Sequence, residues 1–182
     1  MEREELGAAL REHAYLEGDF VLRSGRRSRY YLDKYRFETR PDLLGPLGEL
    51  IAEAAREFEP EASRLAGPEL GAVALAAAAS LSSGLPFLIV RKEAKDYGTA
   101  NRLEGVSEEG ELVCLVEDVV TSGGAAVEAL REAGLRVGTA VCVVDRDEGG
   151  ADELARAGVR LRPLFHASEL LAAPKSAAKP HG

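Results

Sequence analysis

The sequence contains no tryptophan, one methionine and only two cysteines among its 182 residues. Cys114 and Cys142 each lie inside a short apolar run, so buried reduced thiols explain them better than a disulfide or a metal-binding pair. Long apolar runs are also missing. The most apolar tract, residues 70–90, is interrupted by serine, glycine and proline, whereas a membrane-spanning helix needs about twenty consecutive apolar residues. The charged amino-terminus is unlike a signal peptide, and we expect a cytoplasmic protein.

The chain has no excess of positive charge. Lysine and arginine number 23 against 31 aspartates and glutamates, and the formal net charge of −8 argues against a protein that coats nucleic acid or a membrane surface. The composition, 46% hydrophobic and 30% charged, is that of an ordinary globular protein, and the length suits one domain with a sizeable core. We therefore predict no nucleic-acid partner and no membrane partner.

Helical patterns alternate along the chain with short apolar runs typical of strands. The spacing predicts a first helix closed by Gly18, and the full set of predicted helices is 2–16, 41–58, 72–82, 123–134 and 151–158. The predicted strands are two within 20–33, then 63–67, 86–90, 112–117, 136–145 and 160–165. This alternation predicts an α/β fold with a mostly parallel central sheet flanked by helices.

The same sequence pattern indicates one main domain with a small amino-terminal region and a short tail. We expect residues 1–172 to form a single domain, with residues 1–40 as a small amino-terminal region laid against the sheet. Residues 91–110 have little apolar content and indicate a long excursion between two strands. The polar, proline-flanked segment 173–182 is predicted to be a disordered tail.

One stretch, LVCLVEDVVTSGGAAVEAL (112–130), carries the clearest chemistry. Ligands of open parallel sheets sit where strands end and helices begin, and we expect Glu117 and Asp118 at that point. The hydroxyls and glycines of 121–124 suit a phosphate at a helix amino-terminus, while the carboxylates suit a ribose diol or a magnesium ion. A phosphorylated sugar fits both features, with its phosphate at 121–124 and its hydroxyls at the carboxylates. A phosphoacceptor aspartate, or a simple helix cap, is the alternative interpretation of this stretch alone.

The sequence resembles a known family at four segments. VEDVVTSGGA (116–125) resembles the motif with which type I phosphoribosyltransferases bind phosphoribosyl pyrophosphate (PRPP). FVLRSGRRSRYYLD (20–33), VRKEAKDYGTANRLEG (90–105) and VVDRDEGG (143–150) narrow the resemblance to orotate phosphoribosyltransferases. The resemblance implies the type I phosphoribosyltransferase fold, with residues 1–40 as a hood segment that binds the base.

The resemblance also implies an activity. Enzymes of this family transfer ribose 5-phosphate from PRPP to orotate, giving orotidine 5′-monophosphate and pyrophosphate, in de novo pyrimidine (UMP) biosynthesis. It implies Mg²⁺ as cofactor, held mainly through PRPP, and a homodimer in which the lid loop of one subunit serves its neighbour. The implied small-molecule partners are PRPP and orotate.

Phosphoribosyl transfer needs cations at the departing pyrophosphate and a lid that excludes water. Arg91, Lys92 and Lys95 on the long polar segment suit this role, although a solvated surface loop is the alternative; with Asp118 they are our catalytic candidates. The family's motif further implies that Glu117 and Asp118 hold the ribose. The loop implied to hold the 5′-phosphate consists of Val119, Val120, Thr121, Ser122, Gly123, Gly124 and Ala125.

The base site is expected at the hood and at the end of the strand 136–145. An arginine fork pairs well with a carboxylate such as that of orotate, so Arg146 is the candidate, the alternative being a surface ion pair with a neighbouring acid. Neighbouring strand residues point opposite ways, so one of Tyr30 and Tyr31 should face the core and the other a pocket; two packing aromatics are the alternative. The resemblance places this pair at the orotate ring and Arg23 at PRPP.

Some residues depart from the family pattern. Tyr97 stands where the lid commonly has histidine, and its phenol, ordinarily with a pKa near 10, is a hydrogen-bond donor at neutral pH. Segment 67–76, which resembles the segment that touches pyrophosphate, contains no lysine. A phosphoribosyltransferase for another base and a non-catalytic PRPP or nucleotide sensor are the rival hypotheses. His13, His166 and His181 are scattered, we expect none of them to lie beside an acidic or metal-ligand partner, and we expect no catalytic or metal-binding role for them.

Overall fold

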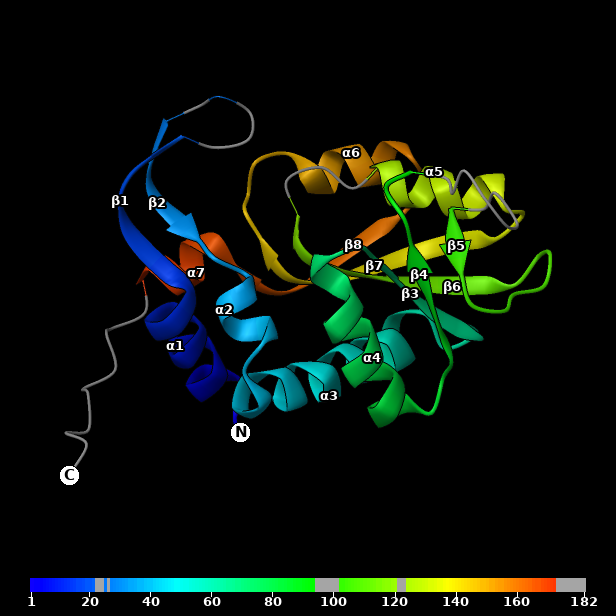
Figure 1. Ribbon diagram of the computed structural model, residues 1–182, viewed down its shortest axis with the longest axis horizontal. Coiled ribbons are helices and arrows are strands. Elements are labelled where there is room, and N and C mark those ends of the chain that lie inside the picture. The colour runs from blue at the N-terminus through cyan, green and yellow to red at the C-terminus, as the bar shows by residue number, and fades with distance from the viewer. Residues whose placement is uncertain (22–24, 26, 94–101, 121–123, 173–182) are drawn as a thin grey trace.

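The computed structural model describes residues 1–21, 25, 27–93, 102–120 and 124–172 (Figure 1). Its helices are α1 (Arg3–Ala14), α2 (Tyr35–Glu38), α3 (Pro41–Phe58), α4 (Gly71–Ser83), α5 (Gly124–Glu132), α6 (Gly150–Arg156) and α7 (Ala167–Ala172). Its strands are β1 (Tyr15–Val21), β2 (Arg27–Leu32), β3 (Arg64–Pro68), β4 (Phe87–Val90), β5 (Leu103–Glu104), β6 (Leu112–Val120), β7 (Arg136–Asp145) and β8 (Arg160–His166).

A six-stranded sheet in the order β5-β4-β3-β6-β7-β8 forms the centre of the structure. All neighbouring pairs are parallel except β4 and β5, which are antiparallel. The predicted α/β fold with a mostly parallel sheet is therefore confirmed. Since parallel strands end on the same side, the carboxyl ends of β3, β4, β6 and β7 line one edge of the sheet, where ligands of such folds bind.

Helices cover both faces of this sheet, which explains why its strands are apolar on both sides. α3 and α4 lie on one face, and α5 and α6 lie on the other (Figure 1). Along β6 the buried side chains alternate between the two cores: Cys114 and Val116 join the core under α3 and α4, whereas Val113 and Leu115 join the core under α5 and α6. Cys114 is buried and not paired in a disulfide, as is Cys142 on β7, so the predicted burial is confirmed for both.

The amino-terminal region differs in part from its prediction. α1 buries Leu6, Leu10 and Ala14 as its spacing indicates, but it ends at Ala14 rather than near Gly18. The reason is strand pairing: Tyr15 faces Leu32 across the antiparallel β1–β2 hairpin, so the residues after Ala14 extend instead of continuing the helix. The hairpin predicted within 20–33 is present, with a longer first strand.

Three short elements were not predicted. α2 is a single helical turn that follows the hairpin, β5 is a two-residue strand inside the polar excursion 91–110, and α7 is a six-residue helix after β8. Segments of this length carry no readable period, so tertiary contacts decide them. Among the described residues, none of the helices combines the length and the apolar character needed to cross a membrane.

Candidate active site

β6 carries the acidic pair, but not at its end. The strand continues through Glu117 and Asp118 to Val120, which pairs with Asp145 of β7. The prediction that the two carboxylates mark the strand end is therefore wrong, because Val119 and Val120 extend the apolar run by one further pair. Asp118 is 5% exposed and Glu117 is partly buried.

Asp118 is held by contacts from two other parts of the chain. Its Oδ2 lies 2.5 Å from Nζ of Lys34, which precedes α2, and its Oδ1 accepts the backbone N–H of Val119. Gly71, the first residue of α4, lies so close that a Cβ there would be 1.7 Å from Oδ2 of Asp118. Burial alone would lower the pKa of Lys34, but the hydrogen bond to Asp118 and the surrounding negative charge raise it.

Two further carboxyl groups are influenced by this pair. Burial, followed by the charge of Asp118, raises the pKa of Glu38 to about 8, and the same two causes raise the pKa of Glu117 to about 8. Glu38, on α2, is 3% exposed and its Oε1 has no hydrogen-bond partner. At neutral pH both groups are therefore held mainly in the uncharged form, and Asp118 with Lys34 forms the ion pair of the cluster.

Arg146, directly after β7, is buried rather than on the surface. Its side chain is 7% exposed, with Nε 3.4 Å from Oε1 of Glu148 but without hydrogen-bond geometry. Its guanidinium carbon lies 5.3 Å from the centre of the Tyr30 ring, a cation–π distance. No acceptor among the described residues meets its Nε or Nη2. An isolated surface ion pair, the alternative for Arg146, does not describe this arrangement.

The two hairpin tyrosines point in different directions, as predicted. Tyr30 is half-buried and stacks on Tyr15 with ring centres 5.6 Å apart, whereas Tyr31 is 40% exposed and packs beside Phe20. The expectation that one of them enters the core is wrong: neither ring belongs to the buried core, which Leu32, the next residue of β2, reaches instead. Tyr30 is the one that meets Arg146.

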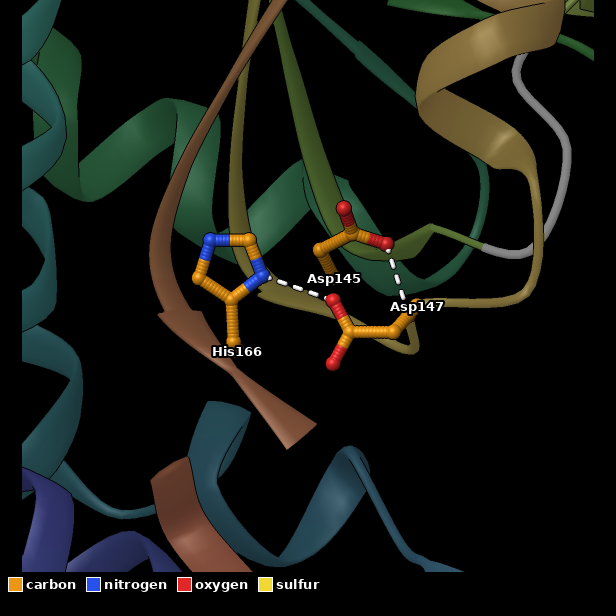
Figure 2. Close-up of side chains that lie close together, drawn as sticks. All are labelled: Asp145, Asp147 and His166. Carbon is orange, nitrogen blue, oxygen red and sulfur yellow. Dashed lines mark hydrogen bonds and ion pairs between the residues drawn. The ribbon is translucent and has the colours of Figure 1, made fainter. Parts of the chain in front are cut away.

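The turn that carries Arg146 is fastened to β8, as Figure 2 shows. Asp147 adopts a φ of 59°, and its N–H donates to Oδ1 of Asp145 at 2.9 Å. Nδ1 of His166 donates to Oδ1 of Asp147 at 2.7 Å, and the hydroxyl of Ser168 donates to its Oδ2 at 3.0 Å. Burial acts to raise the pKa of Asp147, but these bonds outweigh it and lower the pKa. The expectation that His166 has no acidic neighbour is therefore wrong.

Asp145, Asp147 and His166 also offer ligand atoms within 4.8 Å of one another. A metal could be held by one imidazole and two carboxylates of this kind. Both acids already take part in the hydrogen bonds just described. These bonds hold the turn after β7 against β8, and they explain the cluster without a metal.

The lid candidates begin at the same edge of the sheet. Arg91 follows β4, and its Nη1 lies 3.6 Å from Oε1 of Glu104 on β5. The backbone N–H of Lys92 donates to Oε1 of Glu69 at 2.8 Å, which joins the start of the lid segment to the turn after β3.

The other predicted site residues lie either next to a segment outside the described residues or within one. The two ends of the predicted phosphate loop are described: Val119 and Val120 end β6, and Gly124 and Ala125 begin α5. Arg23, Lys95, Tyr97, Thr121, Ser122 and Gly123 lie outside the described residues. Lys34 and Glu38 were missed by the sequence reasoning, because neither stands in a motif and only the packing of α2 against α4 brings them near Asp118.

Known proteins resemble the chain closely, although no family model matches it. The orotate phosphoribosyltransferase of Methanocella arvoryzae is 53% identical over 157 residues, which cover 85% of this chain and 88% of that protein. The crystal structure of orotate phosphoribosyltransferase from Aeropyrum pernix matches with a TM-score of 0.81 and 36% identity, over 91% of this chain and 96% of that one. The Mycobacterium tuberculosis orotate phosphoribosyltransferase in complex with PRPP matches with a TM-score of 0.76 and 29% identity, over 92% and 98%.

Proposed function

Because the chain belongs to the orotate phosphoribosyltransferase family of enzymes, we propose that it transfers ribose 5-phosphate from PRPP to orotate in pyrimidine (UMP) biosynthesis. The products are orotidine 5′-monophosphate and pyrophosphate. The observation that carries the choice of base is the buried Arg146 beside the ring of Tyr30, at the edge of the sheet where β6 presents its acidic pair.

The Arg146–Tyr30 arrangement suits a flat, anionic base. A buried guanidinium with unpartnered N–H groups is costly unless a ligand satisfies them. The carboxylate of orotate offers two oxygens for a charge-assisted pair of hydrogen bonds, while its planar ring suits the aromatic face of Tyr30. Tyr31, on the other side of the hairpin, is the weaker base contact of the two, since it is exposed and packs beside Phe20.

PRPP would lie along the ends of β6 and β3. In this proposal Glu117 and Asp118 accept hydrogen bonds from the ribose hydroxyls, and residues 119–125 surround the 5′-phosphate at the start of α5. The PRPP complex of the M. tuberculosis relative supports PRPP as the ribose donor. Arg23 stays a predicted PRPP contact.

The leaving pyrophosphate would be met by Arg91, Lys92 and Lys95. As the bond from the anomeric carbon to the pyrophosphate oxygen lengthens, positive charge develops on the ribose and negative charge on the leaving group. Arg91 and Lys92 stand at the start of the lid segment, at the same edge as the acidic pair. Closure of this segment over the site would exclude water, and Tyr97 would donate a hydrogen bond to phosphate.

Magnesium fits this site mainly through the substrate. Both oxygens of Asp118 already have protein partners, Lys34 and the N–H of Val119, and burial keeps Glu117 mainly uncharged at neutral pH, so neither acid of the pair is a ready ligand for a cation. Mg²⁺ prefers oxygen ligands and keeps several waters, and it would neutralise charge on the diphosphate when bound. A homodimer that shares its lid residues, and a cytoplasmic location, stay predictions.

A panel of bases tests the proposal. Purified protein with PRPP and magnesium is mixed separately with orotate, uracil, adenine and hypoxanthine, and pyrophosphate release is measured. We expect release with orotate alone. Release with adenine or hypoxanthine and none with orotate would assign the enzyme to another base, and PRPP binding without release from any base would indicate a sensor.

A further inference from the structure

The ammonium of Lys34 lies where three distant segments meet. Nζ is 2.5 Å from Oδ2 of Asp118 on β6. A Cβ on Gly71, at the first residue of α4, would be 2.7 Å from the same Nζ. The carboxylate proposed to hold the ribose and the ammonium of Lys34 therefore both lie against the amino-terminus of a 13-residue helix. The side chain is 32% exposed, so its ammonium is not enclosed.

The surroundings suit an anionic ligand more than a purely structural ion pair. Helix amino-termini carry unsatisfied N–H groups and a partial positive charge. The segment 67–76 that forms this turn has no basic residue, so the cation at the turn is supplied by Lys34. An ammonium has three N–H donors, and Asp118 accepts from one of them.

Glu38 adds an independent observation. Its carboxyl group is almost fully buried beside Lys34 and Asp118, and Oε1 has no hydrogen-bond partner. Burial keeps this carboxyl mainly uncharged at neutral pH. Glu38 therefore adds no second negative charge beside the Lys34–Asp118 pair at neutral pH, and an incoming phosphate group meets less repulsion there.

We propose that Lys34 is a PRPP-binding residue whose ammonium contacts the diphosphate at the first turn of α4 while Asp118 holds it in place. This rests on the proposed function, which places PRPP at this edge of the sheet. Lysine binds phosphate as a compact point charge, and the contact with Asp118 would join the ribose subsite to the diphosphate subsite.

Binding measurements separate this role from a structural one. The affinities of PRPP, pyrophosphate and ribose 5-phosphate are measured by calorimetry with magnesium, for the wild type, Lys34→Gln and Lys34→Arg. Glutamine removes the charge but can still donate a hydrogen bond to Asp118, whereas arginine keeps the charge. Arg36→Gln is the matched control, since Arg36 lies on α2, is 52% exposed and pairs with Asp33.

Lys34→Gln is expected to weaken PRPP and pyrophosphate about tenfold, the size of one charged hydrogen bond, and to change ribose 5-phosphate less than twofold. Lys34→Arg should keep most of the affinity, and Arg36→Gln all of it. The proposal is overturned if Lys34→Gln leaves pyrophosphate affinity unchanged, or weakens ribose 5-phosphate equally, since Lys34 would then act only by placing Asp118.

The readout is independent of the base. A wild-type protein that binds PRPP but fails to use orotate would contradict the proposed function and still leave the Lys34 comparison decisive. A wild-type protein that binds neither PRPP nor pyrophosphate would overturn both proposals.

Discussion

The guanidinium group of Arg146 lies over the ring of Tyr30, with 5.3 Å between the guanidinium carbon and the ring centre. One residue comes from the turn after β7 and the other from the β1–β2 hairpin. The hairpin is thereby joined to the carboxyl edge of the sheet, at the place where we propose that the base binds.

Replacing Arg146 by alanine should impair orotate binding selectively. A hydrogen bond to a charged group contributes about 1.5–3 kcal/mol, so we expect KM for orotate to rise roughly 10- to 100-fold while PRPP affinity stays within about twofold. Steady-state kinetics with each substrate varied measures this. Arg3→Ala is the control, because Arg3 also lies over an aromatic ring, Phe165, at 4.8 Å, but at an exposed site. An equal loss of PRPP affinity in Arg146→Ala would contradict the assignment.

His166→Ala should loosen the turn that carries Arg146. Without the 2.7 Å hydrogen bond to His166, the side chain of Asp147 keeps its bond to Ser168, and its backbone N–H keeps its bond to Asp145. We expect KM for orotate to rise about three- to tenfold, with kcat nearly unchanged. His166→Asn, which can still donate to Asp147, should restore most of the affinity. If both variants behave alike, the hydrogen bond does not position Arg146.

Gly71→Ala should disrupt the Lys34–Asp118 pair. Its Cβ would lie 1.7 Å from Oδ2 of Asp118, so the carboxylate must move. Overpacking of this kind costs about 1–3 kcal/mol of stability, and PRPP affinity should fall with it. Gly45→Ala in α3, where a Cβ meets nothing within 4 Å, is the control and should leave PRPP affinity unchanged. Urea unfolding and calorimetry give both numbers; an undiminished PRPP affinity in Gly71→Ala would count against the contact.

Glu38 should make the protein less stable as the pH rises. Its pKa is raised from 4.5 to about 8 by burial and by Asp118, while Lys34 acts in the opposite direction and Asp33 adds to the increase. A raised folded-state pKa of an acid gives stability that is present below pH 4.5 and lost between about pH 4.5 and 8.

Glu38→Gln should therefore match the wild type near pH 4.5 and exceed it by a few kcal/mol near pH 8, since one unit of pKa corresponds to about 1.4 kcal/mol. Urea unfolding across this pH range tests the prediction. Parallel stability curves for the two proteins would show that Glu38 ionises normally in the folded state.

Long elements were predictable from the sequence because their periods are strong. α3 begins at Pro41 and ends at Phe58 as its spacing predicts, and β7 spans 136–145 as predicted. The strand β6 was predicted, but the predicted strand ended at residue 117, three residues too early. The acidic pair interrupts the apolar pattern, which Val119 and Val120 then resume.

The site was predictable only where a motif carried it. Tyr30, Arg146 and the acidic pair stand in recognisable segments, and the structure adds that Tyr30 and Arg146 meet. Lys34 and His166 could not be found in this way. Their partners are 84 and 19 residues away in the chain, and only the packing of the folded protein brings them together.

The most direct test of the account is the consumption of orotate, followed by its ultraviolet absorbance, with purified protein, PRPP and magnesium. We expect orotate to disappear in a one-to-one ratio with pyrophosphate released, and the rate to collapse in Lys95→Ala if the lid cation meets the leaving group. Orotate that persists while PRPP is bound would contradict the central claim, whatever the variants show.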